Sequence, residues 1–169
     1  GLFDRGSSSY YAGLISQSFA VPFIMPCDAP VNANPSHHFT MNAAYHALDL
    51  WLRDGVAPSI AERLEIEGVP PQIAVDEFGN ARGGIRSPYV DAPLASFGGI
   101  GTGSVMCMIF GTMEKFSQEQ LADIYPSREH YLARVRQSLD QSLQKQFLLP
   151  EDADKIWSAS QKMALGISR

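Results

Sequence analysis

Glycine and proline residues are concentrated between Val56 and Gly103, and they limit the regular structure that this part of the chain can form. Proline removes a backbone hydrogen-bond donor, and closely spaced glycines favour turns. Two short apolar runs, LEI at 64–66 and IAV at 73–75, lie among them, and the pair Gly79-Asn80 suits a hairpin turn. This stretch therefore predicts short strands joined by ordered loops.

A first helix is expected before this stretch, after a segment with no sustained hydrophobic period. Residues 1–35 contain many Ser, Gly, Pro and Asn residues, which is typical of a loop. The helix is then predicted from about Thr40, which can cap its start, to Arg53, with Gly55 at its end. Its apolar stripe consists of Ala44, Leu48, Trp51 and Leu52. We expect an amphipathic helix.

Helical patterns return after Phe116. The tetrapeptide SQEQ at 117–120 fits a capping box, in which a serine and a glutamine satisfy the first backbone donors of a helix. Apolar residues then repeat at spacings of three and four: Leu132, Val135, Leu139 and Leu143. A last helix is predicted to begin at Pro150, because proline suits the first helical turn, and to end before Gly166.

Composition excludes several classes of partner. The 169 residues and the 45% hydrophobic content are typical of one soluble domain with a core. The net charge of -5 provides no basic surface for nucleic acid or anionic lipid, so we expect neither partner. The longest apolar candidate for a membrane span, FAVPFIMPCDAP, is interrupted by prolines. The sequence leaves the cellular compartment open.

The cysteines and histidines predict no metal site and no cofactor. Cys27 and Cys107 are too few for a disulfide framework and lack the spacing of metal ligands. Two buried thiols are the favoured interpretation, and a single bridge between them is the alternative. The four histidines also lack metal-site spacing, such as that of an HExxH motif.

Two short motifs resemble catalytic or binding loops only in part. The stretch GSSSY at 6–10 lacks the second glycine of the G-x-S-x-G elbow that exposes a nucleophilic serine, and no β-branched strand precedes it. The stretch GGIGTGS at 98–104 could approach a phosphate through its backbone amides, but no lysine follows as in a P-loop. A structural loop is the favoured interpretation of the second stretch.

Two further segments contain candidate site residues. His37 and His38 are expected on the loop before the first helix, where a general base could face a cleft, with His38 slightly favoured. The segment 76–93, DEFGNARGGIRSPYVDAP, places Arg86 among glycines and near two carboxylates. It predicts either an ordered loop with a paired arginine, which is favoured, or an arginine that grips a substrate carboxylate in bidentate fashion.

Four stretches stand in the chain in a recognisable order: NAAYHALDLWLRDGVAPSIAERLEI, DEFGNARGGIRSPYVDAPLASFGG, CMIFGTMEKFSQEQLADIYPSREHYLARV and FLLPEDADKI. Together they resemble the C-terminal part of a family of large α/β-hydrolase-domain proteins, over most of the chain from about Cys27 to Ala164. The resemblance implies an α/β fold of which this chain is the C-terminal segment, mostly helices with a few short strands and long ordered loops. It divides the chain into a histidine-loop region (1–39), a packing helix (40–55), a Gly/Pro-rich strand-loop region (56–115) and a helical appendage (116–169).

The resemblance also implies an activity, the hydrolysis of carboxylic esters or related acyl compounds by Ser-His-acid chemistry. In an α/β-hydrolase the nucleophile lies on an elbow within a mostly parallel sheet, and the acid and histidine follow it in the chain. No elbow and no run of βα units is visible in this sequence, so the nucleophile is expected upstream of Gly1 or on another chain. We expect a small-molecule ester as substrate of the intact protein and no turnover by this chain alone. The alternative is a non-catalytic binding or assembly module derived from a hydrolase.

Residues of this chain can be matched to the family one by one. The triad histidine of the family lies in a loop of the type A-G-x-x-H-x-D, and RGSSSYY places Ser9 at the position of the histidine and Tyr11 at that of the aspartate. The chain then lacks its base, or His38 supplies it, or the first dozen residues align differently. Asn32 in PVNANP and Arg86 in GGIR match family positions, where the resemblance implies substrate positioning.

Overall fold

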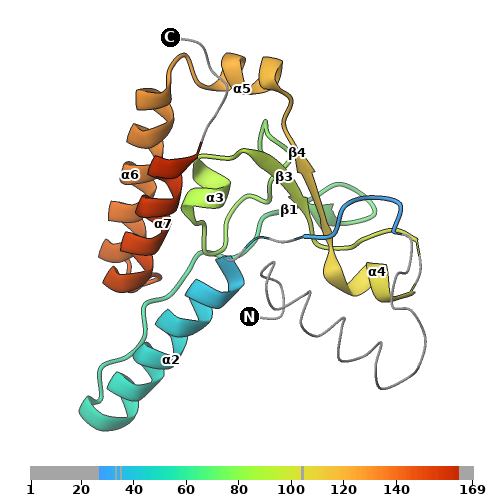
Figure 1. Ribbon diagram of the computed structural model, residues 1–169. Coiled ribbons are helices and arrows are strands. Elements are labelled where there is room, and N and C mark those ends of the chain that lie inside the picture. Colours follow the sequence, from blue (N-terminus) through green and yellow to red (C-terminus); the bar gives the residue numbers. More distant parts are fainter. Residues whose placement is uncertain (1–26, 33, 35, 104, 164–169) are drawn as a thin grey trace, which may run out of the picture.

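The computed structural model describes residues 27–32, 34, 36–103 and 105–163 of the chain (Figure 1). Within them the chain forms α2 (Ser36–Asp54), α3 (Pro88–Asp91), α4 (Val105–Phe110), α5 (Gln118–Ile124), α6 (Arg128–Gln144) and α7 (Pro150–Lys162). The strands are β1 (Ile66–Glu67), β2 (Gln72–Ile73), β3 (Ala95–Gly98) and β4 (Thr112–Lys115). The prediction of helices with a few short strands and long ordered loops is confirmed.

The main apolar core lies among α5, α6 and α7, and α3 packs against α6 (Figure 1). In α6, Val135 and Leu139 are fully buried, as the spacing of three and four predicts. Burying one such side chain stabilises a fold by about 1.5–3 kcal/mol. The hydroxyl of the buried Tyr125 donates a hydrogen bond of 2.9 Å to the carbonyl oxygen of Pro93, which joins α5 to the segment before β3.

The starts of the C-terminal helices also agree with the sequence. Ser117 and Gln120 form the predicted capping box of α5, and α7 begins at Pro150 and ends at Lys162, before Gly166. Among the described helices, none combines the length and the apolar character needed to cross a membrane. The C-terminal third of the chain therefore follows local sequence signals closely.

Helix α2 differs from its prediction at one end. Its C-terminus is as expected, because Gly55 adopts a positive φ of 71° and its amide donates to the carbonyl oxygen of Trp51. Its start lies at Ser36 rather than near Thr40, so the predicted Thr40 cap is wrong. The side chain of Asn34 accepts hydrogen bonds from the amide and the hydroxyl of Ser36, which caps the helix one turn earlier.

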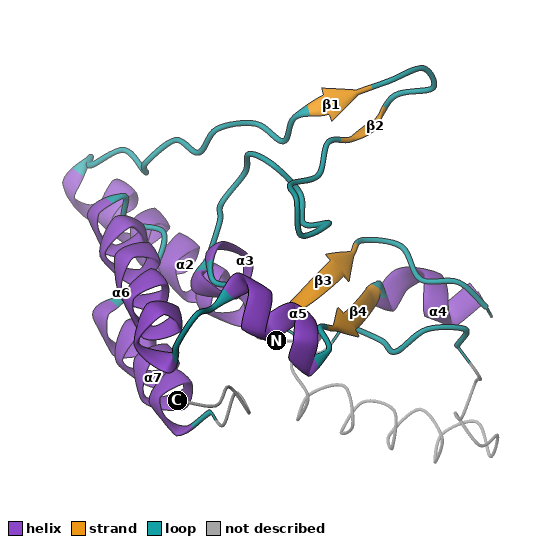
Figure 2. Cartoon of the chain, turned by 90° about the horizontal axis from the view of Figure 1, so that it is seen from above, coloured by secondary structure: helices purple, strands orange, loops and turns teal. Residues whose placement is uncertain are grey.

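The Gly/Pro-rich region contains short strands, as predicted, in two antiparallel pairs. β1 includes Ile66 of the LEI run and β2 includes Ile73 of the IAV run, whereas β3 and β4 correspond to neither run. The hairpin β1–β2 stands away from the helices in Figure 2. The Gly79-Asn80 pair lies in the predicted turn, which an antiparallel bridge between Val75 and Ala81 closes. Asn80 is buried, accepts a hydrogen bond from the amide of Phe97 at 2.9 Å and so fixes this turn against β3.

Strands β3 and β4 form a two-stranded ribbon in which Ala95 lies opposite Lys115 and Phe97 opposite Met113. The connection between the strands runs through the glycine-rich residues 98–103 and α4. A Cβ atom at Gly111 would overlap the carbonyl oxygen of Gly98, so these two backbone segments approach as closely as they do only because Gly111 lacks a side chain. This geometry supports the interpretation of residues 98–103 as a structural loop.

The two cysteines form a disulfide between Cys27 and Cys107. The prediction of two buried thiols is therefore wrong, and the alternative of a single bridge is correct. Cys27 reaches α4 because it forms an antiparallel bridge with Gly103, and the next amide, that of Asp28, donates to the carbonyl oxygen of Thr102 at 3.1 Å. These contacts join segments far apart in the sequence, so local spacing carries no signal of the pairing.

Candidate functional site

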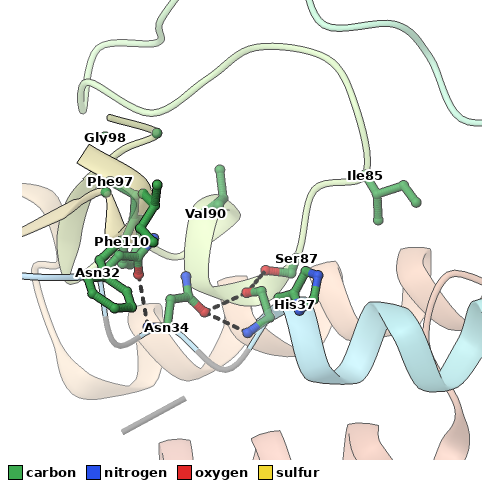
Figure 3. A pocket seen from close by; sticks show the side chains of 13 residues that line it. Asn32, Asn34, His37, Ile85, Ser87, Val90, Phe97, Gly98 and Phe110 are labelled. Atoms are coloured by element: carbon green, nitrogen blue, oxygen red, sulfur yellow. Dashed lines mark hydrogen bonds between the residues drawn. The ribbon is translucent and has the colours of Figure 1, made fainter. Parts of the chain in front are cut away.

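A pocket with a volume of about 320 Å³ lies at the N-terminal end of α2 (Figure 3). We name it the polar pocket after the hydrogen-bonded amide and hydroxyl side chains in its lining. The Oδ1 atom of Asn32 accepts a hydrogen bond from the backbone amide of Asn34 at 2.9 Å. The Oδ1 atom of Asn34 accepts hydrogen bonds from the backbone amide of Ser36 at 2.8 Å and from its hydroxyl at 2.6 Å. The hydroxyl oxygens of Ser36 and Ser87 lie 2.9 Å apart, so the hydrogen bonds continue from α2 to the residue before α3.

The polar groups of this pocket are hydrogen-bonding side chains. Among the described residues that line it are amide, hydroxyl and imidazole side chains, and no carboxylate. Apolar side chains, including Ile85, Val90 and Phe97, complete the wall. The lining thus combines a few hydrogen-bonding groups with apolar side chains, a combination that is typical of small-molecule sites.

Three polar residues of the pocket were not predicted from the sequence: Asn34, Ser36 and Ser87. A signal for the first two was present, because asparagine followed by proline and serine is typical of a helix start. The predicted helix start at Thr40 left Asn34 and Ser36 outside the helix, so this signal was not recognised. For Ser87, 51 residues away from Ser36, the sequence carries no comparable signal.

The two candidate histidines lie in the first turn of α2 and not on a preceding loop, so that prediction is wrong. The helix begins earlier than expected, and successive helical residues diverge by about 100° around the axis. His37 lines the polar pocket together with Asn32. His38 lies instead beside Asn42, with Nε2 3.5 Å from the amide nitrogen of that residue. The catalytic roles predicted for both histidines stay predictions.

Asp152 in α7 is the nearest buried carboxylate to His38. Its Oδ2 accepts a hydrogen bond of 2.7 Å from the side chain of Asn42, and its Oδ1 accepts one of 2.8 Å from Lys155. Burial by itself would raise the pKa of Asp152, but the hydrogen bonds from Asn42 and Lys155 outweigh it and the pKa lies below its ordinary value. The carboxylate thus fastens α2 to the first turn of α7.

Replacing Asp152→Asn is expected to lower the free energy of unfolding by about 1.5 kcal/mol at neutral pH, because a charge-assisted hydrogen bond and an ion pair are lost. A lowered folded-state pKa contributes stability above the unfolded-state pKa of about 3.9, and this contribution is lost as the pH falls through the folded-state pKa. The difference between the variant and the unaltered chain should therefore shrink on acidification. Urea unfolding at neutral and acidic pH measures it.

The matched control for this experiment is Asp154→Asn, on the exposed face of the same helix. Its effect on unfolding should be small at both pH values. If Asp152→Asn loses the same stability in acid as at neutral pH, the stabilisation does not come from the ionised carboxylate of Asp152, and the prediction is wrong.

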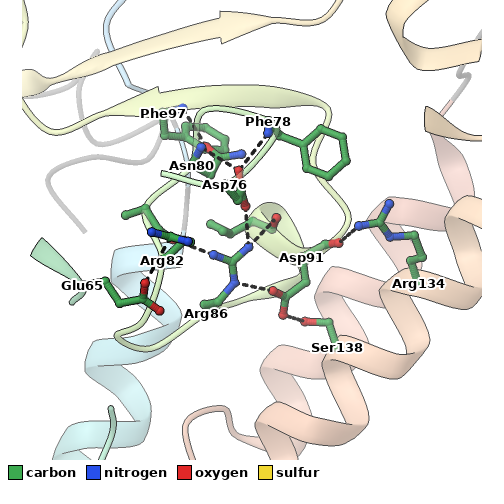
Figure 4. Close-up of polar contacts among 12 residues, drawn as sticks. Glu65, Asp76, Phe78, Asn80, Arg82, Arg86, Asp91, Phe97, Arg134 and Ser138 are labelled. Atoms are coloured by element: carbon green, nitrogen blue, oxygen red, sulfur yellow. Dashed lines mark hydrogen bonds and ion pairs between the residues drawn. The ribbon is translucent and has the colours of Figure 1, made fainter. Parts of the chain in front are cut away.

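Arg86 is held by four hydrogen bonds that come from one turn and one short helix (Figure 4). Its Nε donates to Asp91 at 2.7 Å, and its Nη2 donates to Asp76 at 2.9 Å. Its Nη1 donates to the carbonyl oxygen of Ala81 at 2.6 Å. Burial by itself would lower the pKa of Arg86, but the hydrogen bonds and charges of Asp91 and Asp76 raise it above the ordinary value.

The contacts of Arg86 continue into α6. The other carboxylate oxygen of Asp91 accepts a hydrogen bond of 2.6 Å from the hydroxyl of Ser138, and its carbonyl oxygen accepts one from Arg134 at 2.8 Å. The network thus joins the 76–80 turn, α3 and α6. Arg86 is paired with carboxylates of an ordered loop, as the favoured interpretation of the sequence predicts. Arg86 does not line the polar pocket, and its substrate-binding role stays a prediction.

Ser9, the residue that matches the family histidine, lies outside the residues that the structure describes. Of the other candidates, the structure brings Asn32 and His37 to one pocket and places His38 and Arg86 elsewhere. The described part of the candidate site is therefore the polar pocket between α2, α3 and the β3–β4 ribbon.

Comparison with known proteins assigns the family. A family model described as alpha/beta hydrolase domain matches residues 7–158. No curated protein and no solved structure matches the chain. The matched residues include the polar pocket, the Arg86 network and most of α7. The chain therefore belongs to the alpha/beta hydrolase domain family.

Proposed function

We propose that this chain is part of a carboxylic-ester hydrolase that acts by Ser-His-acid chemistry, with the nucleophile outside the chain. The observation that carries the proposal is the family match, combined with the kind of sheet present. The nucleophile elbow of an α/β-hydrolase joins a strand of a mostly parallel sheet to a helix. The described residues contain two antiparallel strand pairs and no parallel pair, so they offer no such elbow.

Apolar side chains of α2 are exposed, which supports the proposal that this chain packs against further protein. In the described structure, Leu48 is 43% exposed and Trp51 is 54% exposed, although both belong to the stripe that an amphipathic helix normally buries. A self-contained binding module would be expected to bury these side chains against its own core. The partner that we propose is the remainder of the hydrolase domain, in the same polypeptide or on another chain.

In this proposal the polar pocket contributes one wall of the ester site. Its amide and hydroxyl groups can hydrogen bond to an ester carbonyl without a charged partner, and His37 reaches the same wall. Ser9 matches the position of the family histidine, and a serine hydroxyl cannot take up a proton near neutral pH as imidazole does. In this proposal either this chain lacks the triad base or His38 supplies it. No metal or cofactor takes part in the proposed reaction.

The test is an esterase assay with a short-chain p-nitrophenyl ester. We expect no turnover by the purified 169-residue chain, because a serine without an adjacent base is not activated. In a parent protein that contains an elbow serine, Ser9→His should raise turnover, whereas Ser8→His beside it should not. Robust hydrolysis by the purified chain would overturn the placement of the nucleophile, and a gene without an upstream segment would favour the binding module.

A further inference from the structure

A second cavity is larger than the polar pocket. It has a volume of about 550 Å³, within the range of about 300–1,000 Å³ that is typical of small-molecule sites. Asn34 and Phe97 line both the cavity and the polar pocket. A molecule with its carbonyl group in the polar pocket would have to pass these two residues to place its apolar portion in the cavity.

One face of the β3–β4 ribbon forms a wall of the cavity. Side chains of a strand alternate between two faces, and in an antiparallel pair the residues opposite each other share a face. Ala95 and Phe97 on β3, with their partners Lys115 and Met113 on β4, line the cavity. Ser96 and Glu114, which alternate with them, do not. The ribbon thus turns its more apolar face to the cavity.

Helices and aromatic residues form the other sides of the cavity. Val135 of α6 and Ile156 of α7 belong both to this lining and to the apolar core. Tyr89 and Tyr131 add hydroxyl groups to this lining. Burial raises the pKa of Tyr89 to about 12, so its hydroxyl is neutral and able to donate a hydrogen bond at ordinary pH.

The charge of the lining also restricts the ligand. Lys115 is the one charged residue among the described residues that line the cavity. A hydrocarbon chain gains affinity in such a lining from the removal of apolar surface from water, whereas a dianionic or strongly polar group would lose hydration without sufficient compensation.

We propose that this cavity binds the hydrocarbon chain of a medium-chain acyl ester whose carbonyl group lies in the polar pocket. The identity of the ligand as an ester rests on the proposed function. The binding of a hydrocarbon chain does not require turnover, so it can be tested separately.

The experiment uses alkyl methyl ketones, which keep the carbonyl group of an ester and cannot be hydrolysed. Binding of 2-hexanone, 2-octanone and 2-decanone to the 169-residue chain is measured by isothermal titration calorimetry. Each added methylene group is expected to tighten binding by about threefold to fourfold, which corresponds to about 0.8 kcal/mol per buried methylene. Binding should be saturable with one site per chain.

Two tryptophan variants on the same strand locate the site. Met113→Trp fills the cavity and should weaken the binding of 2-decanone at least about tenfold, because the added ring occupies the space of the alkyl chain. Glu114→Trp places the same side chain on the other face of the ribbon and should leave the affinity unchanged. If Met113→Trp does not fold, the chain-length series on the unaltered chain decides the proposal by itself.

The outcomes separate this proposal from the proposed function. Absence of saturable binding, an affinity that does not depend on chain length, or equal effects of the two tryptophan variants would overturn the proposal. A parent protein could bind the ketones with the expected chain-length dependence and yet hydrolyse no ester. That result would support the cavity as a site for hydrocarbon chains and would contradict the proposed hydrolase activity.

Discussion

Replacing Cys27 and Cys107 together by serine is expected to lower the free energy of unfolding by about 4 kcal/mol. The disulfide joins residues separated by 80 positions, and a link across so long a loop restricts the unfolded chain strongly. In the folded chain it fastens the segment before α2 to α4. Backbone contacts of the same segment, including the antiparallel bridge between Val31 and Thr112, hold it against the region of α4 and β4 as well.

Urea unfolding with and without a reducing agent measures this contribution. The reductant should lower the unfolding midpoint of the unaltered chain to near that of the double serine variant, and should leave the midpoint of the variant unchanged. A double variant as stable as the oxidised chain would show that the bridge contributes little. Because disulfides persist in oxidising environments, we expect the more stable form to be that produced in an oxidising compartment.

Replacing Arg86→Leu is expected to lower the free energy of unfolding by about 3 kcal/mol. The substitution leaves the carboxylates of Asp76 and Asp91 partly buried without their shared cation, and it removes the donor to the carbonyl oxygen of Ala81. Arg86→Lys should restore only part of this stability, because a single ammonium group cannot reach the separate acceptors as the planar guanidinium does. Thermal and urea unfolding measure both variants.

Arg82 offers the matched control, four residues earlier in the same loop. Its side chain is 43% exposed, compared with 28% for Arg86, and its partners Glu65 and Glu67 are exposed as well. Exposed ion pairs contribute about 0–1 kcal/mol, so Arg82→Leu should have a much smaller effect. Equal losses from the two variants would contradict the role of Arg86 as the centre of the network.

The candidate site could be predicted from the sequence only in part. The resemblance directed attention to Asn32 and Arg86, and the position of His37 before the predicted helix made it a candidate. The structure places Asn32 and His37 in one pocket. The sequence could not show that His38 lies beside Asn42, which hydrogen bonds to Asp152. That arrangement depends on where α2 begins and on how α7 packs against it. Nor could it indicate Ser87, which meets Ser36 only through folding.

For this protein, the sequence by itself determined the features that depend on neighbouring residues. These include the capping box at Ser117, the start of α7 at Pro150, the glycine end of α2 and the turn at Gly79-Asn80. The physical reason is that backbone dihedral preferences and capping hydrogen bonds act within about one helical turn.

Only the tertiary structure decided the pairing of Cys27 with Cys107, the pairing of Arg86 with two carboxylates and the lining that the polar pocket shares with the larger cavity. Each of these brings together groups from separate segments of the chain, and their positions follow from how the helices and the β3–β4 ribbon pack. Such contacts form because packing buries apolar surface and pairs polar groups across the whole fold, and no local pattern encodes which distant partner is met.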